Sequence, residues 1–144
     1  MNINLVKNGD FKDNFNYWKE QTNLCVEQED GTYYAHAKNT TSQIVPILQT
    51  LEEGNKFARG QQYQLTLKAR ASKSANMSAT LNVIGTDQHE VNVASSPESQ
   101  VLSDEWHQYT FTFDINNTVS LNIDQTDLII YGFEDVTNIS LEKK

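Results

Sequence analysis

Hydrophobic and polar residues alternate with a period of two along much of this chain. Apolar residues occupy every second position of segments 63–70, 77–83, 108–113 and 119–124, and polar residues lie between them in almost every case. Successive side chains of a β-strand point to opposite faces, so this period predicts strands with one buried and one polar face. Antiparallel sheets that pack on one side and meet water on the other produce such a pattern.

Seven further segments are predicted strands, separated from one another by turn-forming residues. They are Ile3–Val6, Leu24–Gln28, Tyr33–Lys38, Gln43–Leu48, Glu90–Ala94, Leu128–Phe133 and Thr137–Glu142. The pair Asp30-Gly31 is a typical hairpin turn and joins the second of these to the third. Helical periodicity is weak, with Gln49–Ala58 as its best candidate. Roughly nine to eleven short strands predict one all-β domain, residues 1–144, built as an antiparallel β-sandwich or jelly roll.

Composition and charge argue against two classes of partner. The formal net charge is −8, with only 11 Lys plus Arg, so we expect neither nucleic acid nor an anionic membrane as a partner. No apolar run approaches the roughly 20 residues of a transmembrane helix. The first residues lack a basic region followed by a long apolar stretch, so we expect no secretory signal on this chain. Localisation stays open, because release by lysis or excision from a larger protein would also bring the domain outside a cell.

No catalytic arrangement of residues is recognisable. The three histidines share no metal-ligand spacing. Carboxylate pairs such as Glu134-Asp135 are sequence neighbours, which extended backbone points to opposite faces. Cys25 lies among apolar neighbours and is predicted to be a small buried hydrophobe and not a nucleophile. We therefore predict a protein that is not an enzyme, with no catalytic residues, no metal and no cofactor.

Four motifs, taken in order, resemble a known family. The opening Asn4–Phe11, followed by Trp18, is similar to the start of carbohydrate-binding modules of families four, nine and twenty-two. The stretch Gly60–Ala71 is similar to the central strand of that family, and Trp106–Phe113 to its later Trp-x-x-Tyr-x-Phe-x-Phe strand. The ending Asn138–Glu142 resembles its closing strand. The resemblance spans nearly the whole chain and implies a β-jelly roll that binds a polysaccharide or oligosaccharide.

Two settings agree with a non-catalytic glycan-binding module. One is a phage adhesion component, and the other is an accessory module of a glycan-degrading enzyme. The alternative is a structural or assembly domain, such as a virion decoration or tail component, that joins a larger protein assembly and binds no sugar. A carbohydrate-binding module is the leading hypothesis because the four motifs occur together and in order.

Many relatives hold a structural calcium ion. The resemblance implies ligands directly after Asn-Gly-x-Phe and before the last strand, where relatives carry acidic residues. Lys12 and Thr137-Asn138 occupy these positions here. Calcium takes several hard oxygen ligands, and an ammonium group repels it. We expect the family calcium to be absent or differently built.

Sugar recognition needs flat aromatic surfaces flanked by side chains that hydrogen-bond hydroxyl groups. Gln64, Lys68 and Arg70 fall in one polar row, and Asn82 falls in another. If both strands share a sheet, the rows form a hydrogen-bonding floor, although a solvated outer face explains them equally well. The predicted carbohydrate-binding residues are Tyr34, Gln64, Lys68, Arg70, Asn82 and Tyr131. Binding across a sheet face and binding at the loop rim both stay open.

The aromatic residues divide into predicted platforms and predicted core. Tyr33 and Tyr34 are adjacent, so one faces outward, and Tyr34 is the predicted platform. Tyr131 is the second, because the neighbouring Gly132 would let a ligand approach closely. Trp18 and Trp106 are predicted to be buried, since large aromatic side chains dominate protein cores.

Overall fold

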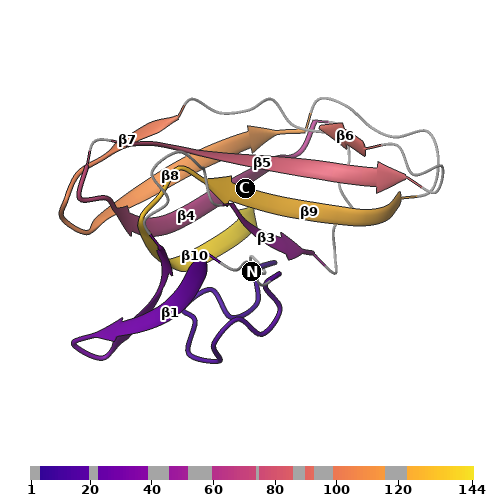
Figure 1. The fold of residues 1–144 in the computed structure, drawn as a ribbon. Helices are drawn as coiled ribbons and strands as arrows, with labels where there is room; N and C mark the ends of the chain where they lie inside the picture. Colours follow the sequence, from indigo (N-terminus) through magenta and orange to yellow (C-terminus); the bar gives the residue numbers. More distant parts are fainter. Residues whose placement is uncertain are drawn as a thin grey trace.

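The protein is a sandwich of two antiparallel sheets (Figure 1). The computed structural model describes residues 4–19, 23–38, 46–51, 60–73, 75–85, 90–92, 99–115 and 123–144. Within these residues the strands are β1 Leu24–Glu29, β2 Thr32–Ala37, β3 Ile47–Thr50, β4 Gln62–Arg70, β5 Ala75–Gly85, β6 Glu90–Asn92, β7 Gln100–Leu102, β8 His107–Asp114, β9 Ile123–Tyr131 and β10 Asp135–Lys143. Sheet I has the order β1-β2-β10-β4-β8, and sheet II the order β3-β9-β5-β6, with β7 paired to β5. The predicted all-β fold class is confirmed.

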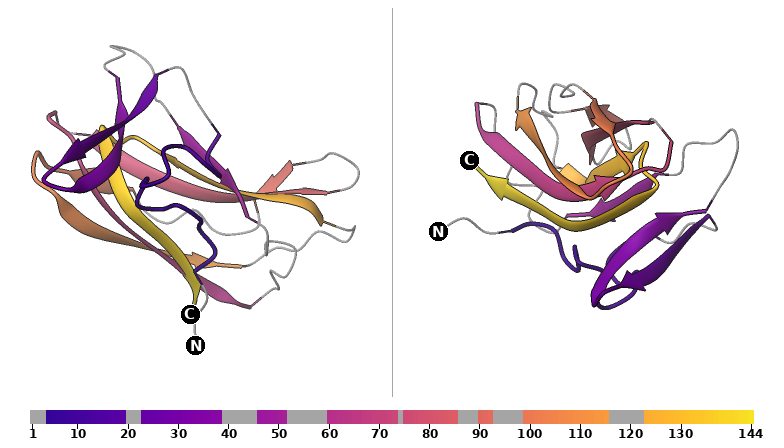
Figure 2. Two further views of the ribbon diagram at one scale, coloured as in Figure 1. Left: turned by 90° about the horizontal axis from the view of Figure 1, so that it is seen from below. Right: turned by 90° about the vertical axis from the view of Figure 1, so that its left-hand side faces the viewer.

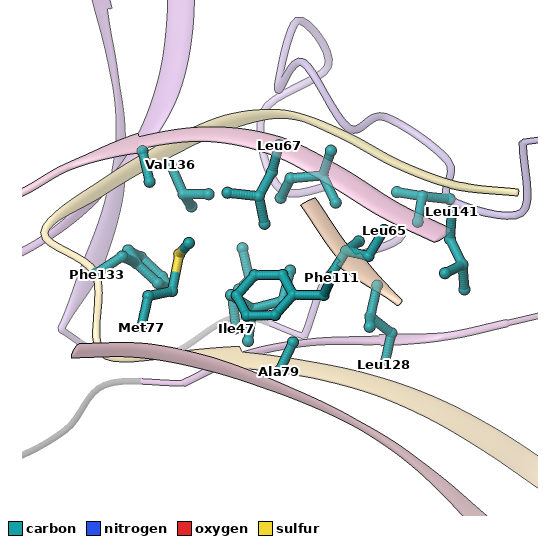
Figure 3. Packing of buried hydrophobic residues seen from close by; sticks show 14 of the residues in the cluster. Ile47, Leu65, Leu67, Met77, Ala79, Phe111, Leu128, Phe133, Val136 and Leu141 are labelled. Carbon is teal, nitrogen blue, oxygen red and sulfur yellow. The ribbon is translucent and has the colours of Figure 1, made fainter. Parts of the chain in front are cut away.

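The core lies between the sheets and consists of the apolar positions of the alternating segments. Figure 3 shows Leu65, Leu67 and Phe111 of sheet I opposite Ala79 and Leu128 of sheet II. All five side chains are buried. Full burial of a large aliphatic or aromatic side chain contributes about 1.5–3 kcal/mol. The predicted alternation is thus confirmed for these strands, and their polar positions form the two outer faces of the sandwich.

The β1–β2 hairpin departs from the rest of sheet I (Figure 2). Its turn is formed by Asp30 and Gly31, both with positive φ (51° and 82°), as a two-residue hairpin turn requires. β2 pairs with β10 at only two positions, Ala35 with Val136 and His36 with Asp135. The end of the hairpin that carries the turn therefore makes no strand pairs with β10.

The N-terminal segment takes over the edge of β10 that β2 leaves free. Leu5 N donates to Leu141 O (2.8 Å), and Ile139 N donates to Gly9 O (3.1 Å). A Cβ on Gly9 would lie 2.0 Å from Ile139 O, so only glycine fits this approach. The register of β10 shifts between Thr137 and Ser140 at the same place. This insertion explains why β2 separates from β10.

Several sequence predictions fail or fall outside the described residues, and residues 43–45 and 93–94 of two further predicted strands are among the latter. Residues 4–6 are not a strand. The side-chain oxygen Asn4 Oδ1 accepts from the Val6 and Leu141 backbone N–H groups, where a strand would use backbone carbonyl oxygens. Gln49 and Thr50 lie in β3 and not in a helix, and residues 52–59 are not described. Most of the predicted strand 119–124 is not described either, and its last two residues belong to β9. Among the described residues no helix is long and apolar enough to cross a membrane.

Candidate functional site

A charged cluster centred on Arg70 lies on the outer face of sheet I. His36, Asp135 and Arg70 are direct neighbours across β2, β10 and β4. Arg70 Nε donates to Asp135 Oδ2 (2.7 Å), and His36 Nδ1 donates to Asp135 Oδ1 (2.7 Å). The Asp135 side chain is only 8% exposed. Both of its oxygens have partners, as a buried carboxylate requires.

Two aromatic rings pack against the Arg70 guanidinium. Its central carbon lies 4.5 Å from the centroid of Trp106 and 5.4 Å from that of Tyr34. The two rings also meet edge to face, with centroids 5.4 Å apart. Cation–π contacts of this kind contribute about 0.5–2 kcal/mol each, depending on exposure. Arg70 is therefore held in one orientation by rings as well as by carboxylates.

The end of the hairpin folds over this cluster. Glu29, the last residue of β1, accepts from Arg70 Nη1 (3.3 Å) and Nη2 (3.0 Å). In a flat sheet β1 and β4 would be three strand spacings apart, about 14 Å, which is too far for this pair. Thr137 on β10 is buried, and its hydroxyl donates to Tyr33 O. The hairpin thus forms a wall at one end of the outer face of sheet I.

The charges in the cluster reinforce one another. Hydrogen bonds to Glu29 and then to Asp135 outweigh burial and raise the pKa of Arg70. The hydrogen bond and charge of Arg70 in turn lower the pKa of Glu29. Burial, followed by the charges of Asp135 and Glu27, raises the pKa of Tyr34. At neutral pH Arg70 is therefore a cation, Glu29 a carboxylate and Tyr34 a neutral phenol.

An open polar strip continues from Trp106 along β4, β8 and β10. Lys68 pairs with Gln108 on β8 and with Thr137 on β10, and Gln64 pairs with Thr112 and Glu142. Lys68 and Gln108 are exposed, and Gln64 is half-buried. The glutamine amides can both donate to and accept from hydroxyl groups, and the Lys68 ammonium can donate to them. Tyr34, Gln64, Lys68 and Arg70, all predicted to bind sugar, therefore share one face.

Asn82 and Tyr131 lie on the opposite surface of the molecule. β4 and β5 are consecutive in the chain but belong to different sheets. Asn82 pairs with Asp127, and Ser78 pairs with Tyr131, on sheet II. The predicted common floor is therefore wrong. Gly132 serves backbone packing and not ligand approach, because a Cβ there would lie 2.1 Å from the Asn76 carbonyl oxygen.

The predicted burial of the tryptophans is confirmed for Trp18 and wrong for Trp106. Trp18 is buried against Phe11, with ring centroids 5.4 Å apart. Trp106 is only half-buried and lies on the outer face against Arg70 and Tyr34. Its place in the alternation indicated this position. Trp106 lies two residues before the polar Gln108, so the two side chains point to the same face, whereas the buried Phe111 points to the other. A tryptophan in phase with the polar residues of a strand was the overlooked signal.

Tyr34 and Cys25 also differ from expectation. Tyr34 is only 6% exposed, so it supports Arg70 and Trp106 and does not present a ring face to solvent. Cys25 is half-buried outside the core, in phase with Glu27, whose Oε1 accepts from its thiol (4.0 Å). Burial, followed by the charge of Glu27, raises the pKa of Cys25. The thiolate is disfavoured, which argues against a nucleophile.

A smaller hollow lies between the N-terminal segment and the hairpin. Its lining includes Lys12, Asn14, Gln28 and the half-buried Tyr33. It offers a tyrosine with amide and ammonium groups, which is the chemistry of a rim site for one sugar unit. The lining also includes Glu27, the pairing partner of Tyr34 in the hairpin.

Comparison with protein families identifies the fold and the type of domain. The sequence model of a carbohydrate-binding domain family, covering families four and nine, matches residues 3–132. The chain belongs to this family. Residues 3–132 include β1–β9. The match to this carbohydrate-binding domain family therefore covers strands of both sheets and is not confined to a single motif. A search of curated proteins found no match.

Solved structures place the carbohydrate-binding domain among jelly-roll modules. A family-four carbohydrate-binding module aligns with a TM-score of 0.61 and 16% identity, over 93% of this chain and 99% of that one. The binding and catalytic modules of a Clostridium thermocellum endo-1,4-β-D-xylanase, complexed with xylohexaose, align at 0.63 with 14% identity, over 100% of this chain and 29% of that one. The enzymatically active domain of bacteriophage CBA120 tailspike protein 4 aligns at 0.64 with 14% identity, over 96% of this chain and 21% of that one. The domain thus spans about a fifth of that tailspike chain.

The family calcium does not fit the loop that would hold it. Lys12 Nζ lies 3.9 Å from Asp10 Oδ2, where an acidic ligand would be needed. Asn8 Nδ2 donates to the carbonyl oxygens of Asn14 and Asn16 (3.0 Å each), so an amide already holds these oxygens. Among the described residues no group of three or more His, Cys, Asp or Glu is placed to hold a metal.

Removal of calcium should therefore leave the carbohydrate-binding domain unchanged. We expect the melting temperature with a chelator to equal that with added calcium, measured by circular dichroism. An ion that binds only the native state, present at 100 times its dissociation constant, would add about 2.7 kcal/mol and raise the melting temperature by several degrees. A fall of that size on chelation would show that a different set of oxygens binds calcium.

Proposed function

We propose that the protein binds a glycan chain across the outer face of sheet I, with one end of the chain at Trp106. The supporting observation is the half-buried Trp106 ring beside the polar strip of Lys68 and Gln108. Aromatic rings contact the apolar faces of sugar rings, and the strip supplies donors and acceptors for hydroxyls. A strand rises about 3.3 Å per residue, so the strip from Arg70 to Gln64 is about 20 Å long, enough for several sugar units.

Arg70 acts in this site mainly by positioning Trp106. Three of its N–H groups already bind Asp135 and Glu29, and its guanidinium carbon lies 4.5 Å from the centroid of the Trp106 ring. A ring held in this way loses little conformational entropy when a sugar binds, which increases affinity. Glu29, Asp135 and Trp106 thus join the predicted Arg70 as functional residues.

The proposed biological setting extends the proposed binding role. The xylanase and tailspike relatives carry such a domain within longer chains. We propose that this domain likewise supplies glycan binding and no catalysis, either as a phage adhesion component or as an accessory module of a glycan-degrading enzyme. An assembly domain of a virion tail is the second candidate, favoured only by the fold shared with the tailspike.

Single substitutions on three surfaces test where the glycan binds. Trp106→Ala removes the ring on sheet I, Tyr131→Ala removes one on sheet II, and Tyr33→Ala alters the hollow. Affinity electrophoresis against neutral polysaccharides should show binding weakened about tenfold or more by Trp106→Ala, since an aromatic contact contributes roughly 1.5 kcal/mol. The other two variants should stay within about twofold of the wild type. Melting curves check that each variant is folded.

Other outcomes identify other sites. A loss confined to Tyr131→Ala would move the site to sheet II, and a loss confined to Tyr33→Ala would move it to the hollow. If the wild-type protein binds no member of a broad glycan panel, the proposal is wrong and the assembly domain becomes the better explanation.

A further inference from the structure

Arg70 has the chemistry of a carboxylate receptor. A guanidinium fork binds a carboxylate through two parallel N–H···O bonds, which is the common way in which proteins recognise acidic groups. Arg70 carries such a fork on the outer face of sheet I, with its central carbon 4.5 Å from the centroid of the Trp106 ring. A glycan at Trp106 therefore lies beside it, and a uronic acid unit there would bring its carboxylate within reach.

The fork is already occupied by a carboxylate of the protein. Glu29 accepts from both Nη1 and Nη2 of Arg70, and Asp135 accepts from Nε. The Glu29 side chain is 49% exposed, so the pair lies at the surface where a ligand would meet it. Because Glu29 is tethered to the same chain, its effective concentration at Arg70 is on the order of millimolar or higher. A free carboxylate has to compete with this tethered one.

The surrounding charge acts in the same direction. Arg70 lies between the carboxylates of Glu29 and Asp135, and a further anion would be repelled. Glu27 is not among its partners, because Glu27 Oε2 accepts from the Tyr34 hydroxyl (3.3 Å). A neutral sugar meets no such penalty, because carboxylate oxygens accept hydrogen bonds from hydroxyls.

The geometry points to Glu29 as a specificity residue that excludes acidic glycans by occupying Arg70 as an internal carboxylate. This inference rests on the proposed site at Trp106 and Arg70. It predicts that the protein takes neutral glycans and that removal of one hairpin charge admits uronic acid polymers. Specificity then comes from an element that repels the wrong ligand, a common device in selective binding sites.

Glu29→Gln and Glu27→Gln form a matched pair for the test. Each removes one carboxylate from β1 and changes the formal net charge from −8 to −7, but only Glu29 contacts Arg70. Affinity electrophoresis would compare polygalacturonate with its methyl-esterified form, and glucuronoxylan with unsubstituted xylan, at low and high salt. We expect Glu29→Gln to gain at least about tenfold for the acidic member of a pair at low salt, and Glu27→Gln and the wild type to show no gain.

A second measurement does not depend on polymer binding. Sodium glucuronate should shift the NMR resonance of the Arg70 Nε–H group in Glu29→Gln and leave it unchanged in the wild type and in Glu27→Gln. If no polymer binds any variant but this shift occurs, the proposed function fails while the role of Glu29 at Arg70 stands. An equal gain in both variants, a wild type that prefers acidic polymers, or no gain and no shift in Glu29→Gln would overturn the inference.

Discussion

Replacement of Trp18 by alanine should lower the free energy of unfolding by about 3–5 kcal/mol. The Trp18 ring is buried against Phe11, and its indole N–H donates to Asn8 O (2.9 Å). The substitution leaves a cavity and an unpaired carbonyl group, and both are costly. It also loosens the N-terminal segment, because the neighbouring Lys19 N donates to Leu48 O on β3 (2.9 Å). Since domains are typically stable by only 5–15 kcal/mol, much of the stability would be lost.

Urea unfolding, followed by circular dichroism, measures this loss. Trp18→Phe keeps most of the packing and removes only the indole hydrogen bond, so it should cost less than half as much. Trp106→Ala is the matched control, because its ring lies outside the core, and it should cost clearly less than Trp18→Ala. Equal losses from the two alanine variants would contradict the distinction between a core and a surface tryptophan.

Replacement of Arg70 by alanine should destabilise the fold by about 2–4 kcal/mol. Asp135 is almost completely buried, and Arg70 and His36 are its two side-chain partners. Removing one partner of a buried pair typically costs about 3–5 kcal/mol, and here His36 and the partial exposure of Arg70 reduce the cost. Lost contacts with Trp106 and Tyr34 add to it. Loss of glycan binding in this variant would therefore be no proof of direct contact with sugar.

A double substitution separates the charge from the packing. Arg70→Ala combined with Asp135→Asn leaves no buried carboxylate without its partner, so it should be more stable than Arg70→Ala alone in the same urea titration. A double variant that is less stable than Arg70→Ala would show that Asp135 does not depend on Arg70. Glu29→Gln should have little effect on stability, because Glu29 is half-exposed and such surface pairs contribute little.

Burial along the regularly alternating strands was predictable because it is a local property. Alternating residues of β4, β5 and β8 showed which side chains are buried, and Asp30-Gly31 showed where β1 turns back. The phase of Trp106 with Gln108 also indicated an outer face, although its size suggested the core. Short or irregular segments were less visible, since a three-residue strand such as β7 is too short to show a period.

The site itself depends on contacts between distant parts of the chain. Glu29, Asp135 and Trp106 meet Arg70 across sequence separations of 41, 65 and 36 residues, and no local pattern connects them. Alternation indicates which side of a strand is polar but not which sheet the strand joins. Asn82 therefore seemed to share a floor with Arg70, although β5 crosses to sheet II.

The sequence by itself determined the all-β class, the buried and polar faces of the main strands and, through four ordered motifs, the resemblance to carbohydrate-binding modules. Each of these follows from the period of the backbone or from short stretches of residues. Only the tertiary structure decided which polar faces lie together and that the hairpin folds over Arg70. The physical reason is that the N-terminal segment takes the edge of β10 from β2 and releases the hairpin, which brings Glu29 to Arg70. Strand pairing of this kind is a competition between distant segments, which no stretch of sequence records alone.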